Sequence, residues 1–255
     1  MPEQNVLQAI LAGWRDWPLP ITEPPKILGP IPGGRTNRNF KVKAPGVEQA
    51  LVLRINNPRG RHLGINRSDE AQIAHTVANA GIAPEPIHRD PNQRFALLPF
   101  IEARTWNSSD FTNPIQRKRL FNLLQTVQAL NPATSRRSYL AYLNHYWNFL
   151  SRAQAITTDL AQQWQTFLPE LEAFDQADWH PKLTHHDMIP ENVLDTGGRL
   201  YLIDWEYAAI GHPDIDRWSI SPSLVREPFI HDLARWTNDL WERVQVALKQ
   251  QNSLV

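Results

Sequence analysis

The chain has 255 residues, which is enough for one large domain or for two lobes around a shared cleft. Lysine plus arginine and aspartate plus glutamate balance at 26 each, and this zero net charge disfavours a nucleic acid or an anionic membrane as partner. The chain contains no cysteine, which excludes disulfides, thiolate metal sites and a cysteine nucleophile.

The N-terminal segment 1–17 predicts an amphipathic helix and not a secretory leader. Its apolar side chains recur at helical spacing without a preceding basic region. They are Val6, Leu7, Ile10, Leu11 and Trp14. No apolar run in the chain is long enough to cross a bilayer. We therefore expect a cytoplasmic protein with no membrane partner, whereas the oligomeric state is not indicated.

Strand patterns dominate from about residue 26 to residue 100. A Gly-rich turn feeds an alternating segment that ends near residue 44, and QALVLRIN reads as a short β-branched strand. A helix is expected over 68–80, with Ile73 and Val77 on one face and Gly81 at its C-terminal end. The segment RFALLPFIEARTW predicts another strand that runs into a polar connection.

From Asn113 onward the patterns are mainly helical. Asn113 and Pro114 form a typical N-cap and first helical position. Two further helices are expected over 138–153 and 158–174, the second kinked or broken at Pro169, and a last helix from about Pro228 to Gln251. Residues 193–204 predict a hairpin. The expected fold is α+β, with a strand-rich N-lobe over 1–102 and a helix-rich C-lobe over 103–255.

The segment LTHHDMIPENVL concentrates polar side chains directly before this hairpin. Asp187 and Asn192 lie in the loop and Asp204 ends the hairpin, so the topology brings all three to one end of a short sheet. Phosphoryl transfer needs such a set: one carboxylate orients the attacking hydroxyl and accepts its proton, and an amide oxygen and a second carboxylate hold Mg²⁺.

Two other interpretations of this segment are a histidine-based metal site and a polar surface loop. Adjacent side chains on an extended loop point in opposite directions, which disfavours one metal ion shared by His185 and His186. We interpret the His186 side chain as solvated, with the acceptor pocket as its alternative environment. An isolated Asp or Asn is more often a turn-capping residue, but the combined pattern favours chemistry.

Together, HHDMIPENVL and YLIDWEYAAIGHPDID resemble the paired motifs of the kinase-like phosphotransferases. These include aminoglycoside phosphotransferases, choline and ethanolamine kinases and bacterial thiamine kinases. The resemblance extends from about Gly33 to Trp218 and implies a two-lobed protein-kinase-like fold that uses ATP and Mg²⁺.

The resemblance also implies roles for the residues of the two motifs. Asp187 would be the catalytic base, and Asn192 and Asp204 would be the Mg²⁺ ligands. His185 is expected to brace the catalytic loop, and Asp216 to support it through hydrogen bonds to its backbone.

The N-lobe would supply the nucleotide side. In this resemblance Gly33, Gly34, Thr36 and Asn37 place backbone N–H groups over the phosphates, and backbone groups around 98–101 bind the adenine edge. Arg54 stands where most kinases have lysine, and Glu70 would pair with it. Taken singly, the two glycines also fit an ordinary turn, and Arg54 also fits a solvated cation at the end of a strand. Glu70 also fits an ordinary acidic residue in the first turn of a helix.

The acceptor is expected to be a small alcohol held mainly by C-lobe helices. A cationic alcohol such as thiamine or choline would bind aromatic faces and carboxylates, for which we select Trp205 and Glu206. Other tryptophans are candidates whose helical spacing equally fits a core: Trp147, Trp218, Trp236 and Trp241.

Three alternatives to this function remain. One is an aminoglycoside or amino-sugar phosphotransferase, and another is a catalytically silent nucleotide-binding module on the same fold. The third is a hydrolase that uses His185 and Asp187 on water, which is disfavoured because no nucleophile or second base is evident.

Overall fold

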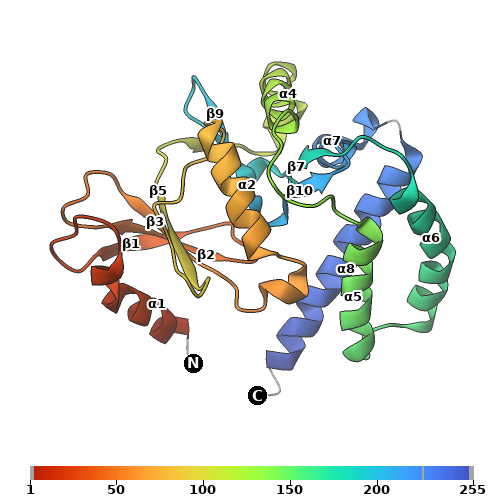
Figure 1. Cartoon of the computed structure of the whole chain (residues 1–255), viewed down its shortest axis with the longest axis horizontal. Coiled ribbons are helices and arrows are strands. Elements are labelled where there is room, and N and C mark those ends of the chain that lie inside the picture. Colours follow the sequence, from red (N-terminus) through yellow and green to blue (C-terminus); the bar gives the residue numbers. More distant parts are fainter. Residues whose placement is uncertain (1–2, 226, 253–255) are drawn as a thin grey trace.

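Five antiparallel strands form the sheet of the N-terminal part (Figure 1). In their order across the sheet they are β1 (Lys26–Ile31), β2 (Arg38–Lys43), β3 (Leu51–Ile55), β5 (Phe95–Pro99) and β4 (His88–Arg89). In this computed structural model, residues 3–225 and 227–252 are described. Arg54 pairs with Asn39 of β2 and with Ala96 of β5, so it lies on the central strand.

Helix α1 (Glu3–Ala12) covers the N-terminal sheet, as its amphipathic pattern predicts. Leu7 and Ile10 are both 6% exposed and belong to one core with Phe40, Leu53 and Leu97 of the strands. Burial of this apolar stripe stabilises a helix that would be marginal in isolation.

Helix α2 (Arg67–Asn79) confirms the helix expected over 68–80. Asn66 caps its first turn by accepting N–H groups of Ser68 and Asp69. At the other end Gly81 has φ +69°, and the N–H of Ile82 returns to the carbonyl of Val77, as in a glycine-terminated helix. The buried face of α2 packs into the C-terminal core and so connects the two parts of the chain.

The C-terminal part is mainly helical (Figure 1). Its helices are α3 (Ser108–Thr112), α4 (Pro114–Gln128), α5 (Tyr139–Arg152), α6 (Thr158–Gln176), α7 (Asp214–Ile220) and α8 (Pro228–Asn252). Asn113 caps α4 through the N–H groups of Ile115 and Gln116, which confirms the expected N-cap. Helix α6 continues through Pro169, so it is not broken there: the flanking Phe167 and Leu171 are buried in a core shared with α5 and α8.

Two small sheets join these helices to the loop before the hairpin. Strands β8 (Val193–Asp195) and β9 (Leu200–Leu202) form the expected hairpin, and β6 (Arg104–Thr105) pairs with β8. Strand β7 (Lys182–Thr184) pairs with β10 (Ala209–Gly211), so the chain entering the loop lies beside the chain that leaves the hairpin.

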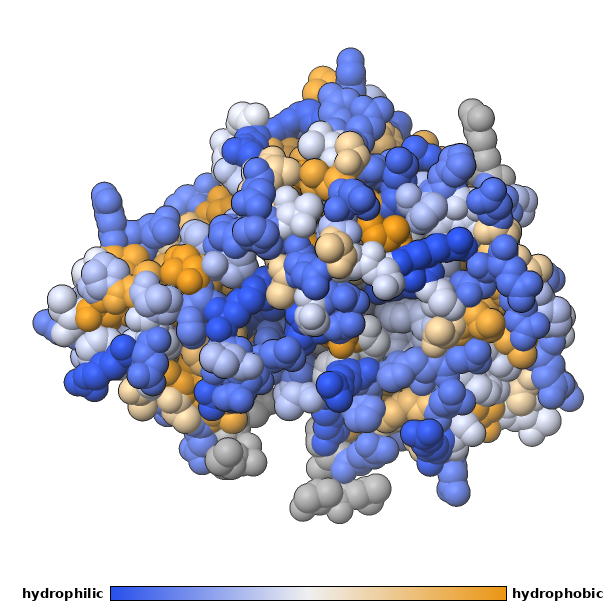
Figure 2. Space-filling view, in the orientation of Figure 1, coloured by the Kyte–Doolittle hydropathy of each residue, from blue (hydrophilic) through white to orange (hydrophobic). Residues whose placement is uncertain are grey.

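Hydrophilic side chains cover most of the face in Figure 2, with apolar ones scattered in small groups. The exposed large apolar residues belong to separate elements: Leu28, Ile115, Ile189 and Val246. None of the helices within residues 3–225 and 227–252 is long and apolar enough to span a membrane.

Candidate active site

The loop from His185 to Asn192 is fixed from beneath by a buried carboxylate. Asp216 is fully buried, and its two oxygens accept the backbone N–H groups of His185 and His186, each at 2.9 Å. The His185 ring donates from Nε2 to the carbonyl of Ile203 at 2.9 Å. Burial lowers the pKa of His185, which keeps the ring neutral. These contacts are the ones expected of Asp216 and His185.

Asp187 and Asn192 lie together at the open side of this loop. The Asn192 amide donates from Nδ2 to the carboxylate of Asp187 at 3.0 Å and to its backbone carbonyl at 2.9 Å. Burial raises the pKa of Asp187 above its ordinary value. The Asn192 contact thus fixes a carboxylate of increased basicity, a property suited to accepting a proton.

Asp204 presents a half-buried carboxylate whose buried oxygen Oδ1 lacks a hydrogen-bond donor among the described residues. Its backbone is left-handed, with φ +63°, and Oδ1 makes no hydrogen bond to the described residues, although Arg54 Nη1 lies 3.9 Å away. Burial and the nearby Asp187 raise the pKa of Asp204 to about 6. A cation bound at this carboxylate would offset both effects.

The donor set around Asp204 fits a hard, oxygen-binding cation. Asn192 directs its amide nitrogen to Asp187, which leaves the amide oxygen available beside the carboxylates. Residues 3–225 and 227–252 contain no group of three or more His, Cys, Asp or Glu arranged for a metal ion. A cation here would therefore take its remaining ligands from phosphates and water, which is how Mg²⁺ is commonly bound.

Arg54 forms the buried ion pair with Glu70 that the sequence predicts. Arg54 Nη2 lies 2.5 Å from Glu70 Oε1, and both side chains are at most 10% exposed. Arg67, which the sequence analysis did not select, bridges Glu70 at 2.7 Å and Glu206 at 3.0 Å. The spacing of three residues between Arg67 and Glu70 on one helix was the available signal.

Asn37 joins this ion-pair network to the β1–β2 loop. Its Nδ2 donates to Glu206 at 2.7 Å, and its Oδ1 accepts from Arg67 Nη2 at 3.0 Å. Burial and the neighbouring Asp204 raise the pKa of Glu206. Asn37 and Arg67 both donate to the Glu206 carboxylate, and Glu206 also lines the cavity described below.

The two glycines of the β1–β2 loop have separate backbone requirements. Gly33 has φ +106°, a conformation that favours glycine. At Gly34 an added Cβ would lie 2.4 Å from the backbone carbonyl oxygen of Asn37, so the turn has no room for a side chain. Thr36 follows, with its hydroxyl 3.4 Å from that of Tyr207.

Arg35, at the tip of the same loop, contacts helix α8. Its guanidinium lies 2.8 Å from Glu242 and 4.6 Å from the ring centroid of Trp241. The Trp241 indole donates to the Tyr207 hydroxyl at 2.8 Å. Arg35, Tyr207 and Glu242 were not selected from the sequence, because no local pattern indicates a contact between the β1–β2 loop and helix α8.

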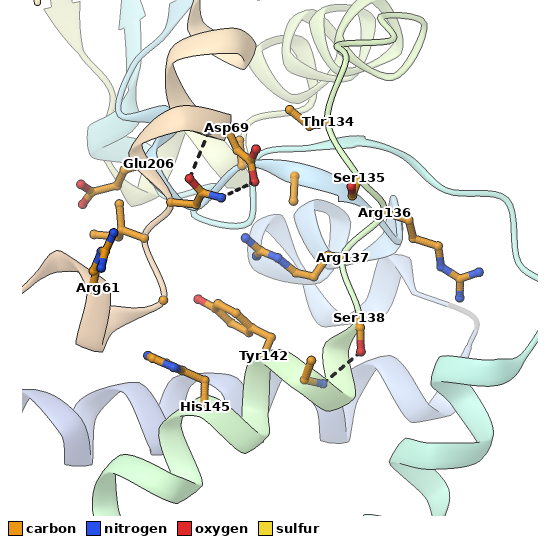
Figure 3. Close-up of a pocket in the computed structure, with 16 residues that line it drawn as sticks. Arg61, Asp69, Thr134, Ser135, Arg136, Arg137, Ser138, Tyr142, His145 and Glu206 are labelled. Carbon is orange, nitrogen blue, oxygen red and sulfur yellow. Dashed lines mark hydrogen bonds between the residues drawn. The ribbon is translucent and has the colours of Figure 1, made fainter. Parts of the chain in front are cut away.

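A cavity of about 400 Å³ opens between the start of α2 and the start of α5, and we call it the α2–α5 cavity (Figure 3). Glu206 lines this cavity, so it remains a candidate for binding the acceptor. Trp205 does not: its ring is 4% exposed, lies 4.6 Å from the His185 ring and borders a pocket of about 40 Å³ near Arg54. The expectation that Trp205 faces the acceptor is therefore corrected.

The other tryptophans selected from the sequence all pack against the helical core. Trp147 stacks on Trp164 at 4.7 Å, and Trp236 packs against Phe167 at 5.1 Å, so both belong to the aromatic core. Trp218 lines a small pocket with His186.

The interpretation of His186 as solvated is wrong. Its Nε2 lies 2.9 Å from the Tyr139 hydroxyl, and its Nδ1 lies 3.1 Å from the carbonyl of Thr184. Its backbone is left-handed, with φ +63°, which turns the ring toward α5 and away from water.

The fold and site define a class of protein: a two-lobed, kinase-like phosphotransferase. The family model described as the phosphotransferase enzyme family matches residues 27–248. The chain therefore belongs to this family.

Two curated relatives carry the name Protein LicA, both from Haemophilus influenzae. One is 30% identical over 203 residues, covering 72% of this chain and 54% of that protein. The other, from strain Rd, is 29% identical over 200 residues, covering 71% of this chain and 68% of that protein. The chain thus matches only about half the length of the first of them.

Solved structures share the fold at lower identity. Choline kinase LicA from Streptococcus pneumoniae has a TM-score of 0.72 at 21% identity, covering 93% of this chain and 90% of that one. A choline/ethanolamine kinase family protein from Mesorhizobium loti has a TM-score of 0.64 at 22% identity, covering 97% of this chain and 87% of that one. Both likenesses extend over the two parts of the chain.

Proposed function

We propose that this protein is an ATP- and Mg²⁺-dependent kinase that transfers the γ-phosphoryl group to the hydroxyl of a small alcohol. The observation that carries the proposal is the grouping of charged and amide side chains around Asp204 and Asp187. Arg54 lies 3.9 Å from Asp204, the charge of Asp187 raises the pKa of Asp204, and Asp187 accepts from Asn192. Groups for binding phosphate, for holding the metal ion and for accepting the hydroxyl proton would then lie next to one another, as phosphoryl transfer requires.

Asp187 is the proposed base. Its raised pKa favours uptake of the hydroxyl proton, and Asn192 and the Asp216-anchored backbone hold it in place. Asp204 and Asn192 are the proposed Mg²⁺ ligands, and bound Mg²⁺ would neutralise charge on the transferring phosphoryl group. His185 supports this arrangement from beneath, without contact to substrate.

Residues 1–102 are the proposed nucleotide side and residues 103–255 the acceptor side. The N–H groups of Gly33, Gly34, Thr36 and Asn37 would cover the phosphates, and Arg54 would bind them with its direction set by Glu70. A structure of LicA in complex with AMP and one of spectinomycin phosphotransferase in complex with ADP, both of this fold, support nucleotide use.

A choline-like alcohol is the first candidate acceptor, because choline kinases share the fold over nearly the whole chain. Thiamine is the second candidate, since it is likewise a cation with a primary hydroxyl. Glu206, which lines the α2–α5 cavity, is the residue proposed to bind such a cation.

The test is an acceptor screen with ATP and Mg²⁺, read out as acceptor-dependent ADP release. The panel contains choline, ethanolamine, thiamine, amino sugars and aminoglycosides. Asp187→Asn should reduce kcat by about 10³-fold or more with little change in nucleotide affinity. Asp178→Asn, at an exposed position, is the matched control and should retain full turnover. Nucleotide binding without phosphorylation of any acceptor, serine and glycerol 3-phosphate included, would favour the catalytically silent nucleotide-binding module.

A further inference from the structure

Two consecutive arginines before α5 have opposite environments. The Arg136 guanidinium donates to the carbonyl of Asp175 at 3.0 Å and lies 3.9 Å from the ring centroid of Trp179. Arg137 leaves the chain in the other direction, into the α2–α5 cavity (Figure 3). Among residues 3–225 and 227–252, no hydrogen-bond acceptor or carboxylate pairs with the Arg137 guanidinium, which only stacks on Tyr142 at 4.3 Å.

The cavity has a second cation and an unsatisfied hydroxyl. Arg61, from the segment before α2, lines the same space and likewise has no paired carboxylate in the described part of the chain. Thr134 Oγ1 is buried at the cavity without a hydrogen-bond partner among the described residues. Figure 3 shows Arg61, Arg137 and Tyr142 around one open space.

The acidic residues of the cavity do not neutralise these arginines. Glu206 is held by Asn37 and Arg67, and Asp69 accepts from the Asn66 side chain at 2.8 Å. A half-buried guanidinium without an acceptor leaves several N–H donors unsatisfied, and a carboxylate or phosphate matches their planar geometry.

Arg137 is also connected to the elements that hold the loop containing Asp187. It borders the small pocket that contains His186, and its backbone N–H donates to the carbonyl of Ile210 at 2.8 Å, on the strand that pairs with β7. A group bound at Arg137 is therefore held at a fixed position relative to the loop that contains Asp187.

We propose that the α2–α5 cavity is an anion-binding subsite, in which Arg137 and Arg61 bind a carboxylate or phosphate ester of the acceptor. This rests on the proposed kinase function and adds a preference within it: among small alcohols, those that also carry an anionic group would be better acceptors than choline, ethanolamine or thiamine, which carry none. The hydroxyl would be presented to Asp187 while the anion is held in the cavity.

Two matched pairs of alcohols test the turnover consequence. Serine is ethanolamine with an added carboxylate, and glycerol 3-phosphate is glycerol with a phosphate ester. In at least one pair, the anionic alcohol should have a kcat/KM at least about tenfold higher than its partner without the anion. The pair that shows this difference tells whether the cavity prefers a carboxylate or a phosphate ester. Arg137→Gln should abolish this advantage through KM, and Arg136→Gln should retain it.

A binding measurement separates failure of the subsite from failure of the kinase function. With the nucleotide side filled by a non-hydrolysable ATP analogue and Mg²⁺, acetate and inorganic phosphate are titrated calorimetrically. Binding of either ion by the wild type and by Arg136→Gln, with loss in Arg137→Gln, supports the subsite even if no alcohol is phosphorylated. Equal binding by both variants, or none by the wild type, overturns it.

Thermal unfolding checks that the two variants differ for the expected reason. Arg136→Gln loses contacts to Asp175 and Trp179 and should lower Tm, whereas Arg137→Gln removes only the stacking on Tyr142 and should lower Tm less.

Discussion

Asp216 accepts the backbone N–H of His185 at 2.9 Å although the two residues are 31 positions apart. Its other oxygen accepts the next N–H, that of His186, also at 2.9 Å. One buried carboxylate thus sets the position of two successive peptide groups directly before Asp187. The geometry of the proposed base consequently depends on a residue that need not contact any substrate.

Asp216→Asn tests this dependence. The amide has one acceptor oxygen, so one of the two N–H groups loses its partner, at about 1–3 kcal/mol, and the loop shifts. We expect kcat to fall about 10- to 100-fold, because small displacements of a reacting group are costly. Asp90→Asn is the control: Asp90 is also buried and accepts the backbone N–H of Arg94 at 3.0 Å, in the turn between β4 and β5, away from the loop. The control should lower Tm and leave kcat nearly unchanged; equal kcat losses would contradict the positioning role.

Gly34→Ala tests the close packing of the β1–β2 loop. An added Cβ at Gly34 would approach the carbonyl oxygen of Asn37 to 2.4 Å, so the loop backbone must move. Because this backbone is proposed to cover the phosphates, KM for ATP should rise about tenfold or more. Gly29→Ala in β1 is the matched control, since its Cβ would have no atom within 4 Å. An unchanged KM for ATP in Gly34→Ala would place the phosphates elsewhere.

Glu70→Gln tests the buried pair with Arg54. The substitution removes the negative charge shared by Arg54 at 2.5 Å and Arg67 at 2.7 Å, which leaves two poorly compensated guanidinium groups. Breaking a buried pair in this way costs about 3 kcal/mol of unfolding free energy, and KM for ATP should rise as Arg54 loses its orientation.

Glu102→Gln provides the comparison for this pair. Glu102 binds Lys41 at 2.9 Å but is 81% exposed, and such surface pairs contribute about 1 kcal/mol or less. Urea denaturation of both variants measures the difference. Similar losses of unfolding free energy in the two variants would argue against the buried network.

Local patterns predicted the elements whose signals lie within a few residues. The cap of α4 at Asn113, the glycine end of α2 at Gly81 and the hairpin β8–β9 all depend on neighbouring residues, and all three are present. The pairing of Arg54 with Glu70 was expected from the resemblance to kinase-like phosphotransferases and not from local spacing, because residues 56–66 separate the strand of Arg54 from the helix of Glu70.

Contacts between distant segments were not predictable in the same way. Arg35 and Glu242 are 207 positions apart, and Arg67 and Glu206 are 139 apart, with no shared periodicity to connect them. Orientation was equally hidden at Trp205: the left-handed turn at Asp204 directs this ring to the core while Glu206 borders the α2–α5 cavity. The residue types at positions 205 and 206 do not indicate that the two side chains point to different places.

Asp195 gives a prediction for the pH dependence of stability. This side chain, 6% exposed, accepts from Arg119 at 2.6 and 2.9 Å, and these hydrogen bonds hold its pKa well below the ordinary value. The folded state therefore favours the carboxylate. Its contribution is fully present above the ordinary pKa of about 4 and is lost as the pH falls toward the lower pKa of the folded state.

Asp195→Asn should lower the unfolding free energy by about 2 kcal/mol near pH 7, because Arg119 then keeps only weaker acceptors. The difference from the wild type should shrink on acidification below about pH 4, where the unfolded wild-type chain binds a proton that the folded chain does not. Urea denaturation across this pH range measures both effects. Asp232→Asn removes an exposed pair with Arg235 and should show neither. A loss in Asp195→Asn that stays constant with pH would mean that packing, and not the charge on Asp195, stabilises this hairpin.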